Sequence, residues 1–249
     1  MGAWRGVLFD KDGTLIDFHH TWVPATVSTA AAMAALAHPG DEGQRAALAR
    51  RLVELIGYDM DAETLDPESL LARGSLGEIA ALWARQAGLE GMEGAVARIG
   101  AEFRDRAVES ASPLLPLEPF FGRLRRRGLR LGIATMDTTE SAHMTFTALG
   151  VSHLLDFVTG FDGGHGEKPG PGMVHGFCAA VGIAQGEVVV VGDSLHDLAM
   201  AKAAGAGLAV AVLSGVAGHD HIAGSADEVI RSVDELEPLL ERLAAGVGA

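Results

Sequence analysis

Two aspartates near the start of the chain have the type and spacing needed for acid chemistry. Asp10 and Asp12 follow the short apolar run 7–9 and precede Gly13, which allows a tight backbone path. Two carboxylates this close repel each other at neutral pH unless a cation lies between them. A bare acidic loop with an Asx turn at Asp10 is the alternative. The apolar run predicts a buried strand, and open α/β sheets bind ligands where their strands end, which favours a ligand site.

Two further polar residues follow predicted strands or lie in loops near them. Thr135 ends the apolar stretch 129–135, where its hydroxyl could donate to a phosphoryl oxygen; a place near the N-cap of the next helix is the alternative. Lys168 precedes Pro169 in a glycine-rich loop. A lysine in a surface loop is usually only solvated, but beside an acidic cluster this one has an electrostatic reason to be held.

A second acidic pair follows the valine-rich stretch 187–192. Asp193 and Asp197 are four residues apart, which is one helical turn, so both carboxylates can face the same point. Asp193 alone could simply cap that helix. Because this pair is expected at the same sheet edge as Asp10 and Asp12, the carboxylates predict an oxygen-rich site suited to Mg²⁺.

The elements that must position these residues alternate between strand and helix after residue 117. The strands are predicted over 7–9, 129–135, 156–160, 187–192, 207–213 and 229–231. Nearly continuous apolar strands separated by helices indicate a parallel sheet covered on both faces. The fold class is therefore α/β, with a doubly wound, Rossmann-like core.

Between the first strand and the rest of that core, the chain reads as helix after helix. Helices are predicted over 24–37, 41–57, 75–88 and 91–109, with Pro24 in a first turn and no strand candidate among them. This pattern indicates an all-α domain inserted into an α/β parent; a single α+β domain is the alternative. The predicted core spans 1–17 and 113–249, and the predicted cap spans 18–112.

Composition limits the partners. The 249 residues carry a net charge of −14, which argues against nucleic acid or an anionic membrane surface as the main partner. The single cysteine, Cys178, excludes an internal disulfide and suits a reducing compartment. There is no apolar run long enough to span a bilayer and no evident signal peptide, so we expect a cytoplasmic protein. Composition leaves the oligomeric state open.

The four polar stretches, in this order, resemble the four motifs of the haloacid dehalogenase-like phosphatase superfamily. The resemblance implies a nucleophile at Asp10, a general acid/base at Asp12, phosphate-binding groups at Thr135 and Lys168, and metal-binding acids at Asp193 and Asp197. It implies Mg²⁺ as cofactor, held by Asp10, Asp12, Asp193 and Asp197. The helical insertion resembles the cap of the phosphoglycolate phosphatase-like branch. Met136, Lys11 and residues 18–20 depart from the common pattern.

The function implied is Mg²⁺-dependent hydrolysis of a small-metabolite phosphomonoester, phosphoglycolate-like, through an aspartyl-phosphate. A phosphomutase of the β-phosphoglucomutase type is the alternative within enzymes, and a non-catalytic binding protein on the same fold is the alternative outside them. Arg73, between predicted helices, is a candidate contact for the far end of the substrate, with a plain surface arginine as the alternative. His20 could line the substrate pocket or simply pack at the hinge into the cap.

Overall fold

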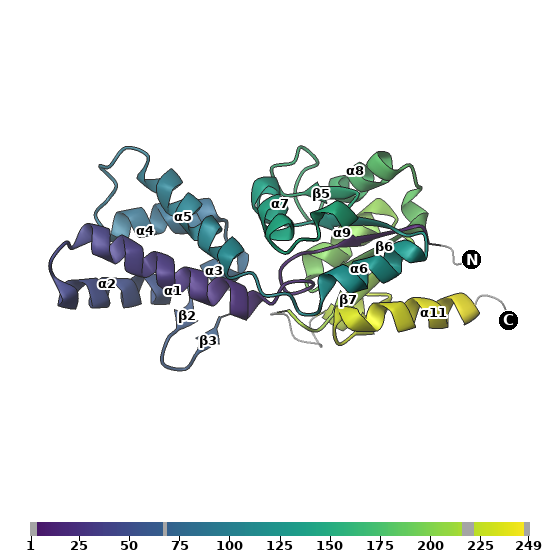
Figure 1. Ribbon diagram of the computed structural model, residues 1–249, viewed down its shortest axis with the longest axis horizontal. Helices are drawn as coiled ribbons and strands as arrows, with labels where there is room; N and C mark the ends of the chain where they lie inside the picture. Colours follow the sequence, from purple (N-terminus) through teal and green to yellow (C-terminus); the bar gives the residue numbers. More distant parts are fainter. Residues whose placement is uncertain (1–3, 67–68, 216–221, 247–249) are drawn as a thin grey trace. The chain divides into compact units, whose positions relative to one another are not determined.

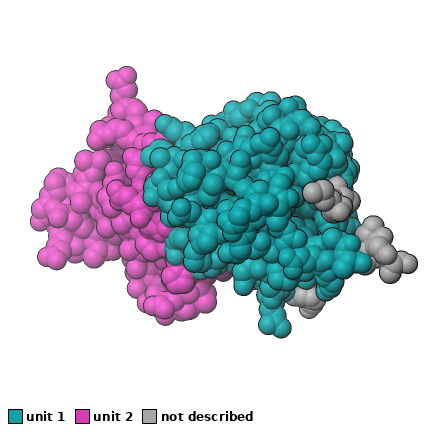
Figure 2. Space-filling model, turned by 45° about the vertical axis from the view of Figure 1, so that its right-hand side comes forward, with its two compact units in different colours: residues 1–18, 112–249 teal, residues 19–111 magenta. Residues whose placement is uncertain are grey.

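The chain forms two compact units (Figure 2). The computed structural model describes residues 4–66, 69–215 and 222–246. Unit 1 comprises residues 1–18 and 112–249, and unit 2 comprises residues 19–111. Unit 1 is therefore assembled from two separate stretches of chain, and unit 2 is one continuous insertion between them.

Unit 1 contains a parallel six-stranded sheet with the order β5-β4-β1-β6-β7-β8 (Figure 1). The strands are β1 (Gly6–Phe9), β4 (Arg130–Ala134), β5 (Phe157–Thr159), β6 (Val188–Gly192), β7 (Leu208–Val212) and β8 (Glu228–Ile230). Each of them was predicted from the sequence, and the α/β prediction is confirmed. Phe9 of β1 pairs with Ile133 on one side and Val191 on the other, so these three strands end side by side.

Helices cover both faces of this sheet. They are α6 (Leu117–Arg126), α7 (Thr139–Ala148), α8 (Gly172–Val181), α9 (Leu195–Ala204) and α11 (Leu236–Gly246), with 3-10 turns at Ser152–Leu154, Gln185–Glu187, Ala223–Ser225 and Val233–Glu235. Alternate residues of a strand point to opposite faces. Phe9 therefore packs with Phe120 and Phe121 of α6, whereas Leu8 joins the cluster that contains Phe177 of α8. Burial on both faces fixes the register of β1 and hence the position of the residue that follows it.

Unit 2 is mainly helical. Its helices are α1 (Phe18–Ala37), which begins at the last residue of unit 1, α2 (Glu42–Leu55), α3 (Leu70–Arg73), α4 (Leu76–Gln86) and α5 (Ala95–Glu109). The ring of Trp83 stacks on Phe103, with centroids 5.4 Å apart and an interplanar angle of 8°, and Trp22 meets Phe103 edge-on at 5.8 Å. The indole nitrogen of Trp83 donates to the carbonyl oxygen of Leu52 at 2.9 Å. This buried aromatic group joins α1, α2, α4 and α5.

Two details of unit 2 differ from the sequence prediction. Pro24 was expected in the first turn of a helix, but α1 begins at Phe18 and Pro24 lies inside it. Burial of Thr21 and Trp22 in the helical conformation outweighs the local preference of proline for a helix start. The prediction that this stretch contains no strand was also wrong, because β2 (Tyr58–Asp59) and β3 (Thr64–Leu65) form a two-stranded antiparallel pair. Strands of two residues are too short to leave a period in the sequence.

None of the described helices combines the length and the apolar character that a membrane crossing requires.

Candidate active site

Asp10 takes its position directly from the central strand. Its backbone N–H donates to the carbonyl oxygen of Val191 at 2.8 Å, which continues the β1–β6 ladder by one residue. The chain then turns sharply: Gly13 has φ +81°, and its N–H donates to the carbonyl oxygen of Ile16 at 2.7 Å. A Cβ on Gly13 would lie 2.5 Å from Oδ2 of Asp193. Glycine is thus required here both by the backbone angle and by the approach of Asp193.

Lys168 contacts two carboxylates. Its Nζ lies 2.5 Å from Oδ1 of Asp10 and 2.6 Å from Oδ1 of Asp197, and its side chain is only 2% exposed. Burial acts to lower the pKa of the ammonium, but the charges of Asp10 and Asp197 outweigh burial and raise that pKa above its ordinary value. Lys168 is therefore a fixed cation beside the proposed nucleophile.

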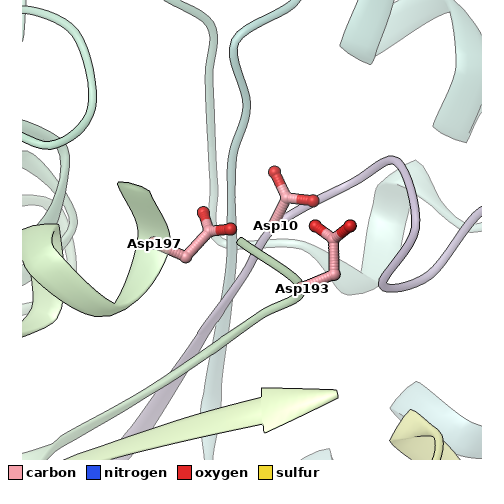
Figure 3. Close-up of side chains that lie close together, drawn as sticks. All are labelled: Asp10, Asp193 and Asp197. Atoms are coloured by element: carbon pink, nitrogen blue, oxygen red, sulfur yellow. The ribbon is translucent and has the colours of Figure 1, made fainter. Parts of the chain in front are cut away.

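Three buried aspartates meet around that contact (Figure 3). One oxygen of each of Asp10, Asp193 and Asp197 lies within 4.8 Å of the others. Burial raises the pKa of Asp10 to about 7, with Lys168 acting in the opposite direction and Asp197 adding to the increase. Burial, followed by the charges of Asp10 and Asp197, raises the pKa of Asp193 as well. Both increases show how costly the ionised carboxylates are without further positive charge.

This group of carboxylates suits a hard divalent cation. Three acids face one ammonium, which leaves an excess of negative charge that a cation would neutralise. Oδ1 of Asp197 is buried, and the ammonium of Lys168 lies 2.6 Å from it. The other oxygen of Asp197 accepts from the N–H and hydroxyl of Ser194, at 3.1 and 2.6 Å, in a capping box that opens α9. Ser194, not Asp193, is thus the N-cap of this helix.

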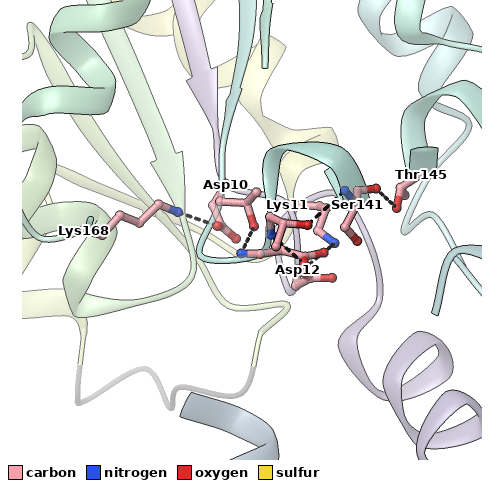
Figure 4. Close-up of polar contacts among 9 residues, drawn as sticks. Asp10, Lys11, Asp12, Ser141, Thr145 and Lys168 are labelled. Atoms are coloured by element: carbon pink, nitrogen blue, oxygen red, sulfur yellow. Dashed lines mark hydrogen bonds and ion pairs between the residues drawn. The ribbon is translucent and has the colours of Figure 1, made fainter. Parts of the chain in front are cut away.

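A second ion-pair group lies on the other side of Asp10 in the view of Figure 4. The side chain of Lys11 is 3% exposed, and its Nζ lies 3.1 Å from Oδ2 of Asp12 and 2.6 Å from Oδ2 of Asp137. Asp12 was predicted as a metal ligand together with Asp10, Asp193 and Asp197. The structure places its carboxylate beside Lys11, and the group of three carboxylates does not include it, so its part in metal binding stays a prediction. The sequence marked Lys11 as unusual, whereas Asp137 carried no signal because no motif covers it.

Thr135 is buried just after β4. Its backbone N–H donates to the carbonyl oxygen of Thr159 at 3.0 Å, and its Oγ1 accepts from the N–H of Asp137 at 3.1 Å. The hydroxyl therefore retains its hydrogen for donation. The alternative reading, an N-cap, belongs instead to Thr138, whose Oγ1 accepts from the N–H of Ser141 at 3.1 Å.

Sequence reasoning missed the segment that follows β7. The hydroxyl of Ser214 donates to the carbonyl oxygen of Gly13 at 2.7 Å, and a Cβ on Gly215 would lie 1.7 Å from Oδ2 of Asp193. Gly215 therefore leaves the room that the Asp193 carboxylate occupies. A lone Ser-Gly pair after a strand is too common to have indicated this.

Arg73 and His20 belong to unit 2. Arg73 ends α3, and His20 is an exposed residue in the first turn of α1. Their roles in substrate binding stay predictions.

Comparison with known proteins agrees with this geometry. The family model of the haloacid dehalogenase-like hydrolases matches residues 4–205. The chain belongs to this family. It is 29% identical over 204 residues to the phosphoglycolate phosphatase of Yersinia pestis, covering 82% of this chain and 78% of that protein. It is 26% identical to the pyrophosphatase PpaX of Halalkalibacterium halodurans, covering 92% and 94%.

A solved structure extends the likeness to the whole fold. The putative β-phosphoglucomutase of Thermotoga maritima superposes with a TM-score of 0.68 at 19% identity, covering 96% of this chain and 99% of that one. At this identity the likeness concerns the fold alone. The recognition made from the four motifs is confirmed: the chain is a hydrolase of this family, and phosphatases are among its relatives.

Proposed function

We propose that this hydrolase is a Mg²⁺-dependent phosphatase that acts on a small phosphomonoester, phosphoglycolate-like in size and charge, through an aspartyl-phosphate. The observation that carries the proposal is the convergence on Asp10. Its carboxylate leaves the central strand and meets a buried lysine at 2.5 Å and two further buried carboxylates. A protein that only binds a phosphate ester has no need for three buried acids beside it, since they repel an anion.

Asp10 is the proposed nucleophile. Its backbone is held in the β1–β6 ladder, so its carboxylate can be kept at attacking distance from a phosphorus atom. As the Asp10 oxygen bonds to phosphorus, the bond from phosphorus to the leaving oxygen breaks. Lys168 and the Thr135 hydroxyl would bind the phosphoryl oxygens as their charge redistributes. When bound by Asp10, Asp193 and Asp197, Mg²⁺ would neutralise the charge that otherwise keeps carboxylate and phosphate apart.

Asp12 is the proposed general acid and base. It lies two residues beyond the nucleophile, at the turn, and its side chain is 17% exposed, so it can reach both substrate and water. In the first step it would give a proton to the leaving oxygen. In the second it would take a proton from the water that attacks phosphorus and releases Asp10.

Unit 2 is proposed to act as the cap of this enzyme. This helical insertion begins just after the first motif and ends before the second motif in the sequence, and we propose it as a lid for the phosphate site. We propose Arg73 and His20 as its substrate-contacting residues. A closing lid would exclude water before attack on the phosphate and would select the substrate by its far end.

The relatives support a small phosphorylated substrate without naming it. One is a phosphoglycolate phosphatase and the other a pyrophosphatase, so the family chemistry is shared while the leaving group differs. The proposed test is turnover of a panel of small phosphoesters with Mg²⁺ and with EDTA. We expect hydrolysis of small anionic monoesters that EDTA abolishes and Mg²⁺ restores.

Two results would overturn the proposal. Full activity in thoroughly demetallated protein would exclude the metal, and absence of hydrolysis across the panel would exclude the phosphatase. A turnover that requires a sugar bisphosphate and returns the phosphoryl group to sugar would indicate a phosphomutase instead.

A further inference from the structure

Lys11 is a buried cation whose place next to the nucleophile has no role in the chemistry proposed so far. It lies between Asp10 and Asp12 in the sequence and is 3% exposed, and it contacts the carboxylates of Asp12 and Asp137. Lys168 thus contacts the first acid of the motif and Lys11 contacts the second. Each of the two proposed catalytic carboxylates therefore has a buried lysine of its own beside it.

A buried ammonium at the position of Lys11 is unexpected on grounds of stability alone. Removing a lysine from water costs several kcal/mol, and well-packed apolar residues often replace buried ion pairs without loss of stability. An apolar side chain after Asp10 would therefore fill this space at a lower cost. Burial acts to lower the pKa of Lys11, yet Asp12 and Asp137 outweigh burial and raise that pKa, so the charge is kept.

Asp137 holds the far end of this group. Its Oδ1 accepts from the N–H of Thr138 at 2.7 Å, and its own N–H donates to Oγ1 of Thr135 at 3.1 Å. Asp137 is thereby fixed between the end of β4 and the start of α7. Its Oδ2 is 2.6 Å from Lys11 Nζ, closer than Oδ2 of Asp12 at 3.1 Å. Lys11 is thus tethered to a rigid part of unit 1, while Asp12 lies in a turn.

We propose that Lys11, anchored by Asp137, is a positioning residue that holds the carboxylate of Asp12 in place for both proton transfers. The proposal rests on the proposed function, because it gives Lys11 its meaning through the acid/base role of Asp12. The ammonium of Lys11 lies 3.1 Å from Oδ2 of Asp12, and a fixed cation at this distance favours one position of the carboxylate, as a proton donor and acceptor requires. Lys11 does not touch the phosphate in this account.

The test compares Lys11→Met with Lys202→Met, which removes an exposed lysine from α9. For Lys11→Met we expect kcat on an alkyl phosphate to fall by about 10²-fold, because misplacing a proton donor by about 1 Å has an effect of that order. KM should change little, since Lys168 and Thr135 are intact. The loss in kcat/KM, which reports formation of the aspartyl-phosphate, should be smaller on p-nitrophenyl phosphate, whose leaving group needs no proton. Phosphoenzyme should accumulate in rapid-quench experiments, because the second step also uses Asp12.

A second variant protects the test against simple misfolding. Lys11→Met leaves two carboxylates without their cation, so the double variant Lys11→Met/Asp137→Asn removes one charge of each sign. The side-chain amide oxygen introduced by Asp137→Asn can still accept from the N–H of Thr138. We expect this variant to fold and to show the same dependence on the leaving group, whereas Asp137→Asn alone, which keeps Lys11 beside Asp12, should lose less activity.

The outcomes separate the two proposals. A double variant that folds and matches wild type on both substrates would overturn the role of Lys11 while the phosphatase stands. An equal loss on both substrates without accumulation of phosphoenzyme would also overturn it, because that pattern indicates general damage. A wild type without activity on any phosphoester would refute the proposed function and this inference with it.

Discussion

The two units bury different kinds of side chain. Among the described residues, unit 1 buries charged side chains, which include Lys11, Lys168 and the three aspartates that meet at the site, Asp10, Asp193 and Asp197. Both units bury aromatic rings, Phe9 and Phe120 in unit 1 and Trp83 and Phe103 in unit 2, but the polar groups that unit 2 buries among its described residues are hydroxyl groups alone. Buried aromatic rings stabilise a fold because they remove a large apolar surface from water and make many van der Waals contacts. Buried charges cost free energy unless they are paired.

Different requirements constrain the interiors of the two units. At the ends of β1, β4 and β6 the need to hold carboxylates and lysines together outweighs stability, which is expected where chemistry is done. Among its described residues, unit 2 buries no charged side chains, and apolar packing organises its interior.

The largest expected effect comes from Asp10→Asn. The amide is nearly isosteric but is no nucleophile, so turnover should fall by at least about 10⁴-fold and no aspartyl-phosphate should be trapped. The variant should still fold, because the change removes a carboxylate whose pKa burial raises to about 7. Rapid-quench trapping and circular dichroism would measure both, with Asp234→Asn as an exposed control in the same unit. Trapped phosphoenzyme in Asp10→Asn would show that another residue is the nucleophile.

Trp83→Ala should have the opposite character, with a large effect on stability. Trp83 is fully buried, stacks on Phe103 and donates to Leu52, so truncation should destabilise unit 2 by about 3–5 kcal/mol. Urea denaturation followed by far-UV circular dichroism would measure it. Leu36→Ala is the matched control, because Leu36 is 43% exposed and should cost less than about 0.5 kcal/mol. A loss in Trp83→Ala as small as in the control would contradict the packing account.

Asp12→Asn should have an intermediate effect that depends on the leaving group. We expect a loss of about 10²–10³-fold on an alkyl phosphate, which needs a proton to leave, and a smaller loss on p-nitrophenyl phosphate. Phosphoenzyme should accumulate because no base activates the attacking water. Steady-state turnover of both substrates is the measurement. Equal losses on the two without accumulation of phosphoenzyme would remove Asp12 from proton transfer.

The smallest effect on activity at neutral pH is expected from proton binding by Asp10, which makes stability depend on pH. The pKa of Asp10 is about 7 in the folded protein against an ordinary 3.8, so between these values the folded state holds the proton and the unfolded state does not. Stability without Mg²⁺ should therefore fall as pH rises from about 4 to 7. Mg²⁺ binds the ionised carboxylate, so its affinity should weaken up to about tenfold per pH unit below 7.

The measurement is the melting temperature with and without Mg²⁺ at pH 5.5 and pH 8. The increase caused by Mg²⁺ should be larger at pH 8, and the Asp10→Asn variant should show a weaker pH dependence. An increase that is equal at both pH values would show that Asp10 does not bind the cation in its ionised form.

The sequence by itself determined the strands of the six-stranded sheet, the order of the motifs and the family. Apolar runs of strand length, each ended by a polar residue, are local signals, and burial of both faces of the sheet requires them. Asp10, Thr135 and Asp193 could therefore be placed at one edge without coordinates, because neighbouring parallel strands end together. Proline predicted a helix start less reliably. Pro24 lies inside α1, because the burial of Trp22 in the helix outweighs the preference of proline for the first turn.

The tertiary structure decided which charge pairs with which. Spacing showed that Asp12 lies near Asp10, but only the fold brings Asp137 to Lys11 from 126 residues away. Lys11 then contacts both Asp137 and Asp12. The room for Asp193 beside Gly13 and Gly215 is likewise a contact between distant loops. Partners of this kind depend on atomic distances of a few ångströms between segments remote in the chain, and a linear pattern does not contain those distances.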